Sequence, residues 1–246
     1  MDNIQVVNVI KGDALYSGKA KTVFATADPK RFIVKFRDDV TAGDGAKKAN
    51  IKGKGYYNAQ ISARLFKLLA DNGISTHYIK MVSEDEMLVH ACDMIKIEVI
   101  PRNIAAGSIV RRYEFKEGQV FAKPVLVMDY KNDAAHDPML NDDIAIALGI
   151  ATDKELRKIR KISLRVNEIL QAYFDERGLL LPDFKLEFGK VDRKIVVADE
   201  ISPDTMRLWK KDTRQSLDKD VFRFDKGDLL AAYDEAAKLI APEIFK

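Results

Sequence analysis

Short runs of alternating apolar and polar residues, separated by turn signals, occupy the N-terminal third of the chain. Thr22–Thr26 and Arg31–Phe36 flank an Asp28-Pro29 turn, and Tyr78–Val82 and Glu86–Ala91 flank a polar turn at residues 83–85. Such pairs of runs are typical of antiparallel strands joined by tight connections. This part of the chain therefore predicts a small antiparallel sheet.

One helix is expected between these strands. Tyr56–Asn72 carries apolar residues at Ile61, Leu65, Leu68 and Leu69, which is the spacing of one face of an α-helix. Gly73 follows at the position where a left-handed residue ends many helices. We expect this helix to pack its apolar face on the sheet.

From Met94 onward the pattern predicts a mixture of strands and helices. Strand-like runs cover Met94–Ile100 and Pro124–Tyr130, with a short helix near Ile104–Tyr113 between them. A long helix is expected from Asp153, capped by Thr152 or Asp153, to Gly178, burying Leu156, Ile159, Val166, Ile169, Leu170 and Tyr173, and a final helix over Asp228–Ile240. The change of pattern favours an α+β fold of two domains, with the small antiparallel sheet in residues 1–92 and a larger mixed α+β domain in residues 93–246.

Two long connections lie between these elements. Arg37–Gly55 is rich in glycine and charge, and Asp129–Asp143 is rich in aspartate. Loops of such length in a compact domain are usually functional or disordered. A plain solvated surface is the other interpretation of both segments.

Composition narrows the range of functions. The chain has 246 residues, 47% hydrophobic and 32% charged, with a formal net charge of +3. These values are typical of a globular protein, and the charge is too small to indicate nucleic-acid binding. No stretch of about 18 apolar residues indicates a membrane span, and the N-terminus lacks the features of a signal peptide. The single cysteine, Cys92, leaves no intrachain disulfide and fits the reducing cytoplasm.

A glycine and two lysines form the first candidate site. In Leu15–Phe24, Lys19 and Lys21 are two residues apart, so both point to one face of an extended segment, and Gly18 allows a close approach of the backbone. Two ammonium groups so placed can hold a polyphosphate, as in the phosphate-covering turns of kinases. The spacing differs from a Walker A motif. Lysines on an edge strand that guard against aggregation are the alternative.

Residues 102–112 offer a second candidate for phosphate binding. Arg102 precedes a small-residue turn that leads to Ser108 and a predicted helix start. A guanidinium, a hydroxyl and free N–H groups would there surround an anion. A tightly packed helix with solvated arginines is the alternative interpretation.

The segment from Leu181 to Trp209 carries the most informative pattern. Its alternation puts Phe184, Leu186 and Phe188 on one face of a strand and Asp183, Lys185 and Glu187 on the other. A second strand, Ile195–Ala198, leads into Asp199, and a hairpin centred on residue 193 would place Asp199 opposite Glu187. Facing carboxylates need a cation between them, and carboxylate oxygens completed by water and phosphate suit Mg²⁺.

The predicted site depends on the register of this hairpin, because a slip of one residue would send the two acids to opposite faces. A salt-bridged surface hairpin is the alternative interpretation. The Pro203-Asp204 turn that follows is expected to aim Arg207 back towards the same face.

Six segments taken together resemble the SAICAR synthetase family, the phosphoribosylaminoimidazole-succinocarboxamide synthases. They are LYSGKAKTVF, TAGDGAKK, PRNIAAGSIVRR, YKNDAAHDPM, DFKLEFG and DEISPDTMRLW. The resemblance implies a two-domain α+β fold with a kinase-like nucleotide cleft between the domains. It also implies a carbon–nitrogen ligase that uses ATP and Mg²⁺ to join L-aspartate to the carboxylate of carboxyaminoimidazole ribonucleotide (CAIR) in purine biosynthesis.

The resemblance assigns roles to particular residues. Gly18, Lys19 and Lys21 would hold the ATP phosphates, and Met94 would lie beside the adenine. Glu187 and Asp199 would bind Mg²⁺, with Lys185 at the transferring phosphoryl group, and these three are the expected catalytic residues. Arg102, Ser108 and Arg207 would bind the ribonucleotide phosphate, and Lys131, Asp137, Asp39 and Asp44 would serve the aspartate site and its lid. The resemblance also implies a homodimer. One residue departs from the family pattern: Pro101 stands where an aliphatic residue is more common.

Two other functions are left open by the residues. One is another Mg-ATP-dependent ligase or small-molecule kinase with the same nucleotide site. The other is a nucleic-acid-binding module that uses the lysine-rich loop, which predicts strongly salt-dependent binding.

Overall fold

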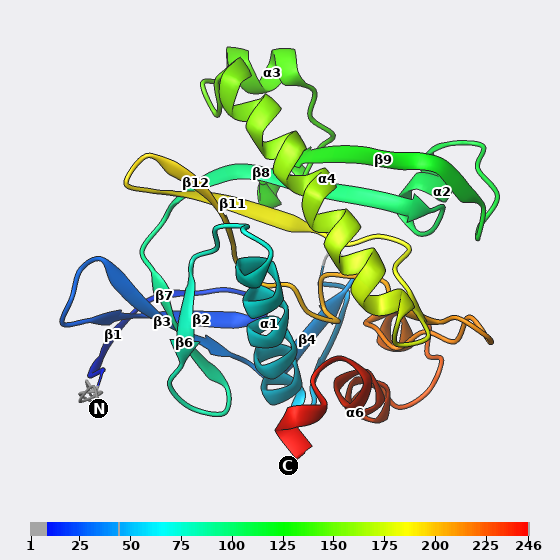
Figure 1. Cartoon of the computed structure of the whole chain (residues 1–246), viewed down its shortest axis with the longest axis horizontal. Helices are drawn as coiled ribbons and strands as arrows, with labels where there is room; N and C mark the ends of the chain where they lie inside the picture. Colours follow the sequence, from blue (N-terminus) through cyan, green and yellow to red (C-terminus); the bar gives the residue numbers. More distant parts are fainter. Residues whose placement is uncertain (1–8, 44, 246) are drawn as a thin grey trace.

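The N-terminal sheet contains both predicted antiparallel hairpins. The computed structural model describes residues 9–43 and 45–245. Its first sheet has the strand order β1-β2-β3-β7-β6 (Figure 1). The strands are β1 (Lys11–Ser17), β2 (Lys21–Thr26), β3 (Arg31–Phe36), β6 (Tyr78–Met81) and β7 (Glu86–His90). β2 pairs with β3 and β6 with β7, which confirms the two hairpins.

The predicted helix is α1 (Lys54–Asp71), which packs on this sheet (Figure 1). Ile61, Leu65 and Leu69 are fully buried and Leu68 is partly buried against the core, so the predicted apolar face is confirmed with Leu68 at its margin. Gly73 follows the helix with a φ of 77°, a conformation that carries no Cβ penalty for glycine. α1 also packs against the C-terminal helix α6 (Leu229–Ile240), which Asp228 caps.

The segment Arg37–Gly55 contains a hairpin and not the long loop that its composition predicts. β4 (Asp39–Ala42) and β5 (Lys47–Asn50) pair antiparallel. Of their residues only Val40 and Ala42 are buried, so the strands carry little hydrophobic signal. Asp44, which falls between these two strands in the sequence, lies outside the described residues.

The second sheet has the order β12-β11-β8-β9. Its strands are β8 (Asp93–Ile104), β9 (Val120–Tyr130), β11 (Leu186–Val191) and β12 (Lys194–Ala198). β8 and β9 contain the two predicted runs and are longer than expected. The helix expected near Ile104–Tyr113 is shorter, α2 (Ser108–Arg112), because Ile104 still pairs with Val120 in the sheet.

The long predicted helix is α4 (Asp153–Asp175), which packs against β8 and β12. Thr152 caps it: its hydroxyl accepts from the Glu155 backbone N–H, and the Glu155 carboxylate accepts from the Thr152 N–H. All six side chains predicted for its buried face are buried. The helix ends before Gly178, earlier than expected.

Short elements connect these parts. The aspartate-rich connection after β9 forms η1 (Asp133–Ala135) and leads to α3 (Asp142–Ala147). The others are β10 (Leu179–Leu180), β13 (Trp209–Lys210), α5 (Asp220–Arg223) and η2 (Pro242–Phe245).

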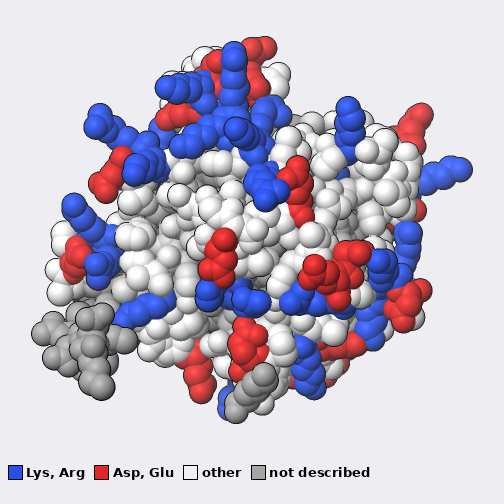
Figure 2. Space-filling view, viewed as in Figure 1, with Lys and Arg blue, Asp and Glu red and all other residues white. Residues whose placement is uncertain are grey.

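Lysines and arginines are interspersed with carboxylates on the face shown in Figure 2. Along α4, Arg157 pairs with Asp153 and Arg165 with Glu168. Exposed pairs of this kind contribute little to stability, but the mixture of signs leaves this face without a broad field of one charge. Among the described helices none is long and apolar enough to cross a bilayer.

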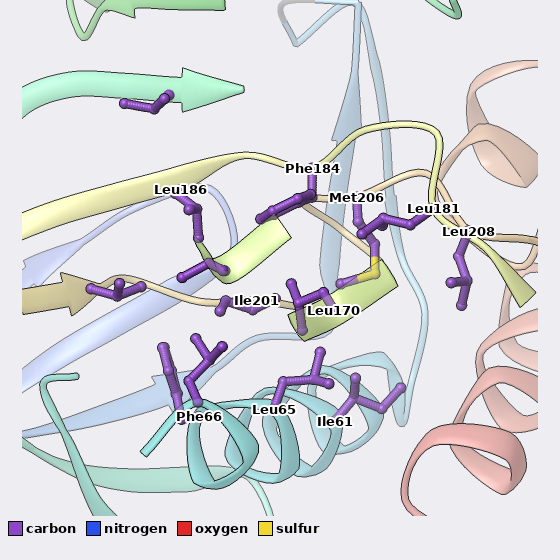
Figure 3. Packing of buried hydrophobic residues seen from close by; sticks show 14 of the residues in the cluster. Ile61, Leu65, Phe66, Leu170, Leu181, Phe184, Leu186, Ile201, Met206 and Leu208 are labelled. Atoms are coloured by element: carbon purple, nitrogen blue, oxygen red, sulfur yellow. The ribbon is translucent and has the colours of Figure 1, made fainter. Parts of the chain in front are cut away.

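One hydrophobic core joins the two sheets. Ile61, Leu65 and Phe66 of α1 pack in one buried cluster with Leu170 of α4 (Figure 3). Phe184, just before β11 of the second sheet, belongs to the same cluster. The division into domains 1–92 and 93–246 stays a prediction, since the sheets follow this boundary while the core crosses it.

Candidate active site

Residues 183–187 and the neighbouring strand β8 each contribute alternate side chains to one cavity. Phe184, Leu186 and Phe188 are buried in the core, and the alternate residues Asp183, Lys185 and Glu187 line a cavity of about 440 Å³. This is the sorting that the alternation predicts. From the paired strand β8, Glu98, Ile100 and Arg102 line the same cavity. The cavity therefore rests on one face of the second sheet.

The predicted pairing of Glu187 with Asp199 is wrong by one residue. Glu187 pairs with Ala198, because the hairpin turns at Asp192 and Arg193, both with positive φ (45° and 64°). Asp199 comes directly after β12 with a φ of 65°, which interrupts the alternation of the strand. This turn of the backbone lets its carboxylate line the cavity together with Glu187.

Glu98 is the carboxylate that faces Glu187 across the ladder. The two residues are paired in register. Lys185 Nζ donates to Glu98 Oε1 at 2.8 Å and to Glu187 Oε1 at 2.7 Å, and Lys131 Nζ donates to the other oxygen of Glu187. The two carboxylates that face each other are therefore Glu98 and Glu187, and the cation between them is the ammonium group of Lys185.

Burial and the neighbouring acids shift the pKa of Lys185 in opposite directions. Burial lowers the pKa of its ammonium group, but Glu187, Asp199 and Glu98 outweigh burial and hold that pKa well above its ordinary value. Burial raises the pKa of Glu98, and Lys185 opposes that shift. Lys185 is therefore a permanent cation within an acidic group.

Lys21 holds a second pair of carboxylates in the cavity. Its Nζ lies 2.7 Å from an oxygen of Asp199 and 2.6 Å from one of Glu200. Burial lowers the pKa of Lys21, but these two acids raise it above its ordinary value. Burial alone would raise the pKa of Asp199, but Lys21, Lys185 and Lys131 hold it below its usual range.

The turn before β2 contributes Gly18 and Lys19 to the same cavity. Lys19 stands in a bend and not in the extended segment that the spacing predicts, and its Nζ lies 3.0 Å from Asp133. Lys19 and Lys21 nevertheless both reach the cavity.

An arginine cluster around Asp183 forms another part of the wall. Asp183 accepts from Arg102 at 2.7 Å and from Arg207 at 2.9 and 3.0 Å, and Arg102 donates to Ser108 Oγ at 3.0 Å. Arg102, Ser108 and Arg207 therefore lie together, with Arg207 aimed at this face as expected. The buried Arg102 Nε has no acceptor among the described residues, which is unusual for a buried polar group.

A second cavity of about 620 Å³ adjoins the first. The two share Lys19, Thr41, Arg207, Lys219 and Arg223. Residues 41–47 of the β4–β5 hairpin line it, except for the undescribed residue 44. Its described lining contains lysines and arginines and no acid, so it favours an anionic ligand.

Some predicted site residues lie apart from these cavities. Lys131 and Asp137 line the first cavity, as expected. Asp39 lines neither, because Arg37 and Asn50 bind its carboxylate. Met94 lines a different cavity with Tyr130.

Several residues of the site were not predicted. Glu98 stands on the same face of its strand as Arg102, a signal that becomes visible once β8 is known to pair with β11. Glu200 follows Asp199, but its partner Lys21 is remote in the sequence, so no spacing reveals the pair. Lys219 and Arg223 are four residues apart, a spacing that places both on one face of a helix but does not by itself indicate a binding site.

Comparison with known proteins gives one consistent result. A sequence model of the SAICAR synthetase family matches residues 14–240. The phosphoribosylaminoimidazole-succinocarboxamide synthase of Methanosarcina acetivorans is 59% identical over 237 residues, which are 96% of this chain and 100% of that protein. The synthase of the same name from Methanocaldococcus jannaschii is 55% identical over 94% of this chain and 95% of its own length.

A solved structure agrees. A SAICAR synthetase (type-2) in complex with ADP has a TM-score of 0.90 and 50% sequence identity, over 92% of this chain and 97% of that one. The α+β fold class is thereby confirmed.

Gly107→Ala is expected to destabilise the protein more than Gly178→Ala. Residue 107 has φ 65° and ψ −128°, and a Cβ there would lie 2.3 Å from an Arg207 nitrogen. Gly178 has a φ of 70°, but a Cβ there would meet nothing within 4 Å. Urea denaturation should show a loss of about 1 kcal/mol of unfolding free energy for Gly178→Ala and about 2–4 kcal/mol for Gly107→Ala. Equal losses would show that neither the backbone angles nor the approach of Arg207 restricts residue 107 more than residue 178.

Proposed function

Because this chain belongs to the SAICAR synthetase family, we propose roles for its residues in the ATP-dependent ligation of L-aspartate to the carboxylate of CAIR. The reaction gives SAICAR, ADP and phosphate in purine biosynthesis. The observation that supports the roles is a single cavity lined both by the lysines and carboxylates around Lys185 and by the arginine cluster around Asp183. Such a cavity suits the phosphates of a nucleotide beside a second anionic substrate.

Phosphoryl transfer solves the chemical difficulty of this ligation. A carboxylate resists attack by an amine because it is anionic and has no good leaving group. In the proposed first step a CAIR carboxylate oxygen bonds to the γ-phosphorus of ATP and the bond to ADP breaks, which gives an acyl phosphate. The aspartate amine then attacks the acyl carbon, phosphate leaves, and the amine loses a proton.

The lysines match the demands of the first step. Phosphoryl transfer depends mainly on positioning and on neutralising the charge of the phosphates. Lys185 is assigned to the transferring group, because its pKa keeps it cationic beside Glu187 and Glu98. Lys19 and Lys21, with the backbone at Gly18, are assigned to the remaining phosphates of ATP.

The residues present fit a Mg²⁺ ion, which the resemblance implies. Glu187 and Asp199 present carboxylate oxygens to the cavity, the ligand type that Mg²⁺ shares with phosphate oxygens and water. Within the described chain no group of three or more His, Cys, Asp or Glu is arranged to hold a metal by itself. When bound, Mg²⁺ supplies neutralising charge to the phosphates.

The ribonucleotide phosphate is assigned to Arg102, Ser108 and Arg207. Guanidinium groups bind phosphate through charge-assisted hydrogen bonds, and a hydroxyl adds a neutral one. The adjoining second cavity shares Arg207 and carries only basic charge in its described lining, which supports an anion at this position.

Lys131 and Asp137 are assigned to L-aspartate. Lys131 suits a substrate carboxylate and Asp137 an ammonium group; both line the cavity, where Lys131 donates to Glu187. Asp44 belongs to the proposed lid over this site, and Met94 to the adenine site near the connector between the sheets. The proposal also includes a homodimer, from the resemblance, and the cytoplasm, from the single cysteine.

ADP release is expected to require both L-aspartate and CAIR. The assay follows ADP and SAICAR with saturating Mg-ATP while each substrate is omitted in turn. Equal amounts of ADP and SAICAR are expected, because each ligation consumes one ATP. Sustained ADP formation over many turnovers without aspartate would favour a small-molecule kinase, whereas at most one ADP per active site fits the proposed first step. Turnover only with another amine would favour a different ligase.

Asp199→Asn is expected to lower ADP formation by at least about 100-fold, because a carboxylate that supports charge neutralisation becomes neutral. The rate is measured across a range of Mg²⁺ concentrations, and circular dichroism checks the fold. Asp192→Asn is the matched control, since it makes the same change at the hairpin turn, where a φ of 45° suits asparagine. Near-normal turnover of Asp199→Asn at limiting Mg²⁺ would contradict the assignment.

Arg207→Ala is expected to weaken CAIR binding by about 10- to 150-fold, or about 1.5–3 kcal/mol for a lost charge-assisted pair. Calorimetric titration measures the affinities for CAIR and for ADP separately. Arg157→Ala, which removes an exposed arginine paired with Asp153, should change neither. A loss of ADP affinity in Arg207→Ala would show that the two phosphate sites are assigned wrongly.

A further inference from the structure

Arg37, directly after β3, joins two segments that are separate in the sequence. Its Nη1 donates to Ser17 Oγ at 2.7 Å and to the Gly18 carbonyl at 3.3 Å. Its Nε donates to Asp39 Oδ2 at 2.7 Å, and its Nη2 lies 2.5 Å from the same oxygen. One guanidinium therefore binds the glycine turn with one nitrogen and the first residue of β4 with the other two.

Asp39, which Arg37 contacts, is itself bonded to the opposite strand at the base of the β4–β5 hairpin. Asp39 pairs with Asn50 in register, and Asn50 Nδ2 donates to Asp39 Oδ1 at 3.1 Å. Hydrogen bonds from Asn50 and Arg37 hold the pKa of Asp39 below its ordinary value, so it stays an anion. Arg37 thus has a charged and fixed partner at the foot of the hairpin.

The two segments held by Arg37 line different parts of the site. Gly18, Lys19 and Lys21, on the side of the glycine turn, line the first cavity. The hairpin supplies Thr41 to both cavities and Gly43 and Lys47 to the second, beside Arg207. The backbone also links these segments, because the Arg37 N–H donates to the Ala20 carbonyl at 2.8 Å and Phe36 pairs with Lys21. The Arg37 side chain adds a direct tie between the glycine turn and Asp39.

We propose that Arg37 is a positioning residue that couples the nucleotide's phosphate site to the ribonucleotide site, so that each ligand tightens the binding of the other. The inference rests on the proposed function, since it takes those two ligands from it. Such coupling is reciprocal by thermodynamic necessity. It also needs arginine, because the three N–H donors of a lysine all sit on one nitrogen and cannot hold both segments with the fixed fork of a guanidinium.

The test measures the dissociation constant of CAIR by calorimetry, with and without saturating Mg-ADP. In the unmodified protein Mg-ADP is expected to tighten CAIR binding by about fivefold or more, and CAIR to tighten ADP binding by the same factor. In Arg37→Lys this factor should fall to about one, while the affinity for each ligand alone changes by less than about threefold, because Arg37 is assigned to neither ligand.

Two further variants isolate the interaction. Arg31→Lys makes the same substitution at the start of β3, where the arginine pairs with Asp28, and should keep the full coupling factor. Asp39→Asn breaks the pair from the other side and should lose the factor as Arg37→Lys does. The double variant should lose no more than either single one, since both remove the same contact.

The outcomes separate this inference from the proposed function. If the unmodified protein makes SAICAR but shows a coupling factor of one, or if Arg37→Lys and Asp39→Asn keep the factor, the inference is wrong and the proposed function stands. If the unmodified protein makes no SAICAR from CAIR, ATP and L-aspartate, the proposed function itself is wrong. A merely structural role for Arg37 would lower the melting temperature and leave the ratio of affinities unchanged.

Discussion

Two glutamates that face each other across neighbouring strands repel, and the ammonium group of Lys185 between them relieves that repulsion. The lysine stands two residues before Glu187, so the backbone itself fixes the distance between cation and acid. On the opposite face Phe184 and Leu186 anchor the same segment in the core. Removing the lysine would leave the half-buried Glu98 without its ion-pair partner and the buried Glu187 with Lys131 alone, which is costlier than losing an exposed ion pair. The shape of the cavity floor depends on this arrangement.

The same ion pairs keep the site ordered before any substrate binds. Lys21, Lys131 and Lys185 each pair with an acid that lines the cavity, so their side chains are already held where the proposed substrates would bind. Phosphate oxygens at Lys21 and Lys185, and a substrate carboxylate at Lys131, would offer these lysines new partners of the same charge. Binding then exchanges one set of ion pairs for another, and little of the side-chain ordering has to be supplied by the ligand.

The sequence predicts the parts of the site that local periodicity determines. The sorting of residues 183–188 into a charged and an apolar face follows from alternation alone, as do the buried faces of α1 and α4. The hairpin register could not be predicted, because it depends on which two residues adopt positive φ. The β4–β5 hairpin was missed because its short polar strands lack a hydrophobic pattern, and the ion pair of Lys21 with Glu200 was missed because it joins remote segments.

The site also depends on places where that periodicity is interrupted. A continued β12 would send Asp199 to the face opposite Ala198 and Glu187, and its φ of 65° prevents this. Asp137, which lines the same cavity, has a φ of 46°, and its carboxylate accepts from the Asn132 N–H at 2.8 Å. Left-handed backbone at a residue other than glycine costs of order 1–2 kcal/mol, least for aspartate and asparagine. The ion pair of Asp199 with Lys21 and the hydrogen bond accepted by Asp137 offset that strain, so the contacts that these two carboxylates make in the cavity also stabilise the backbone that brings them there.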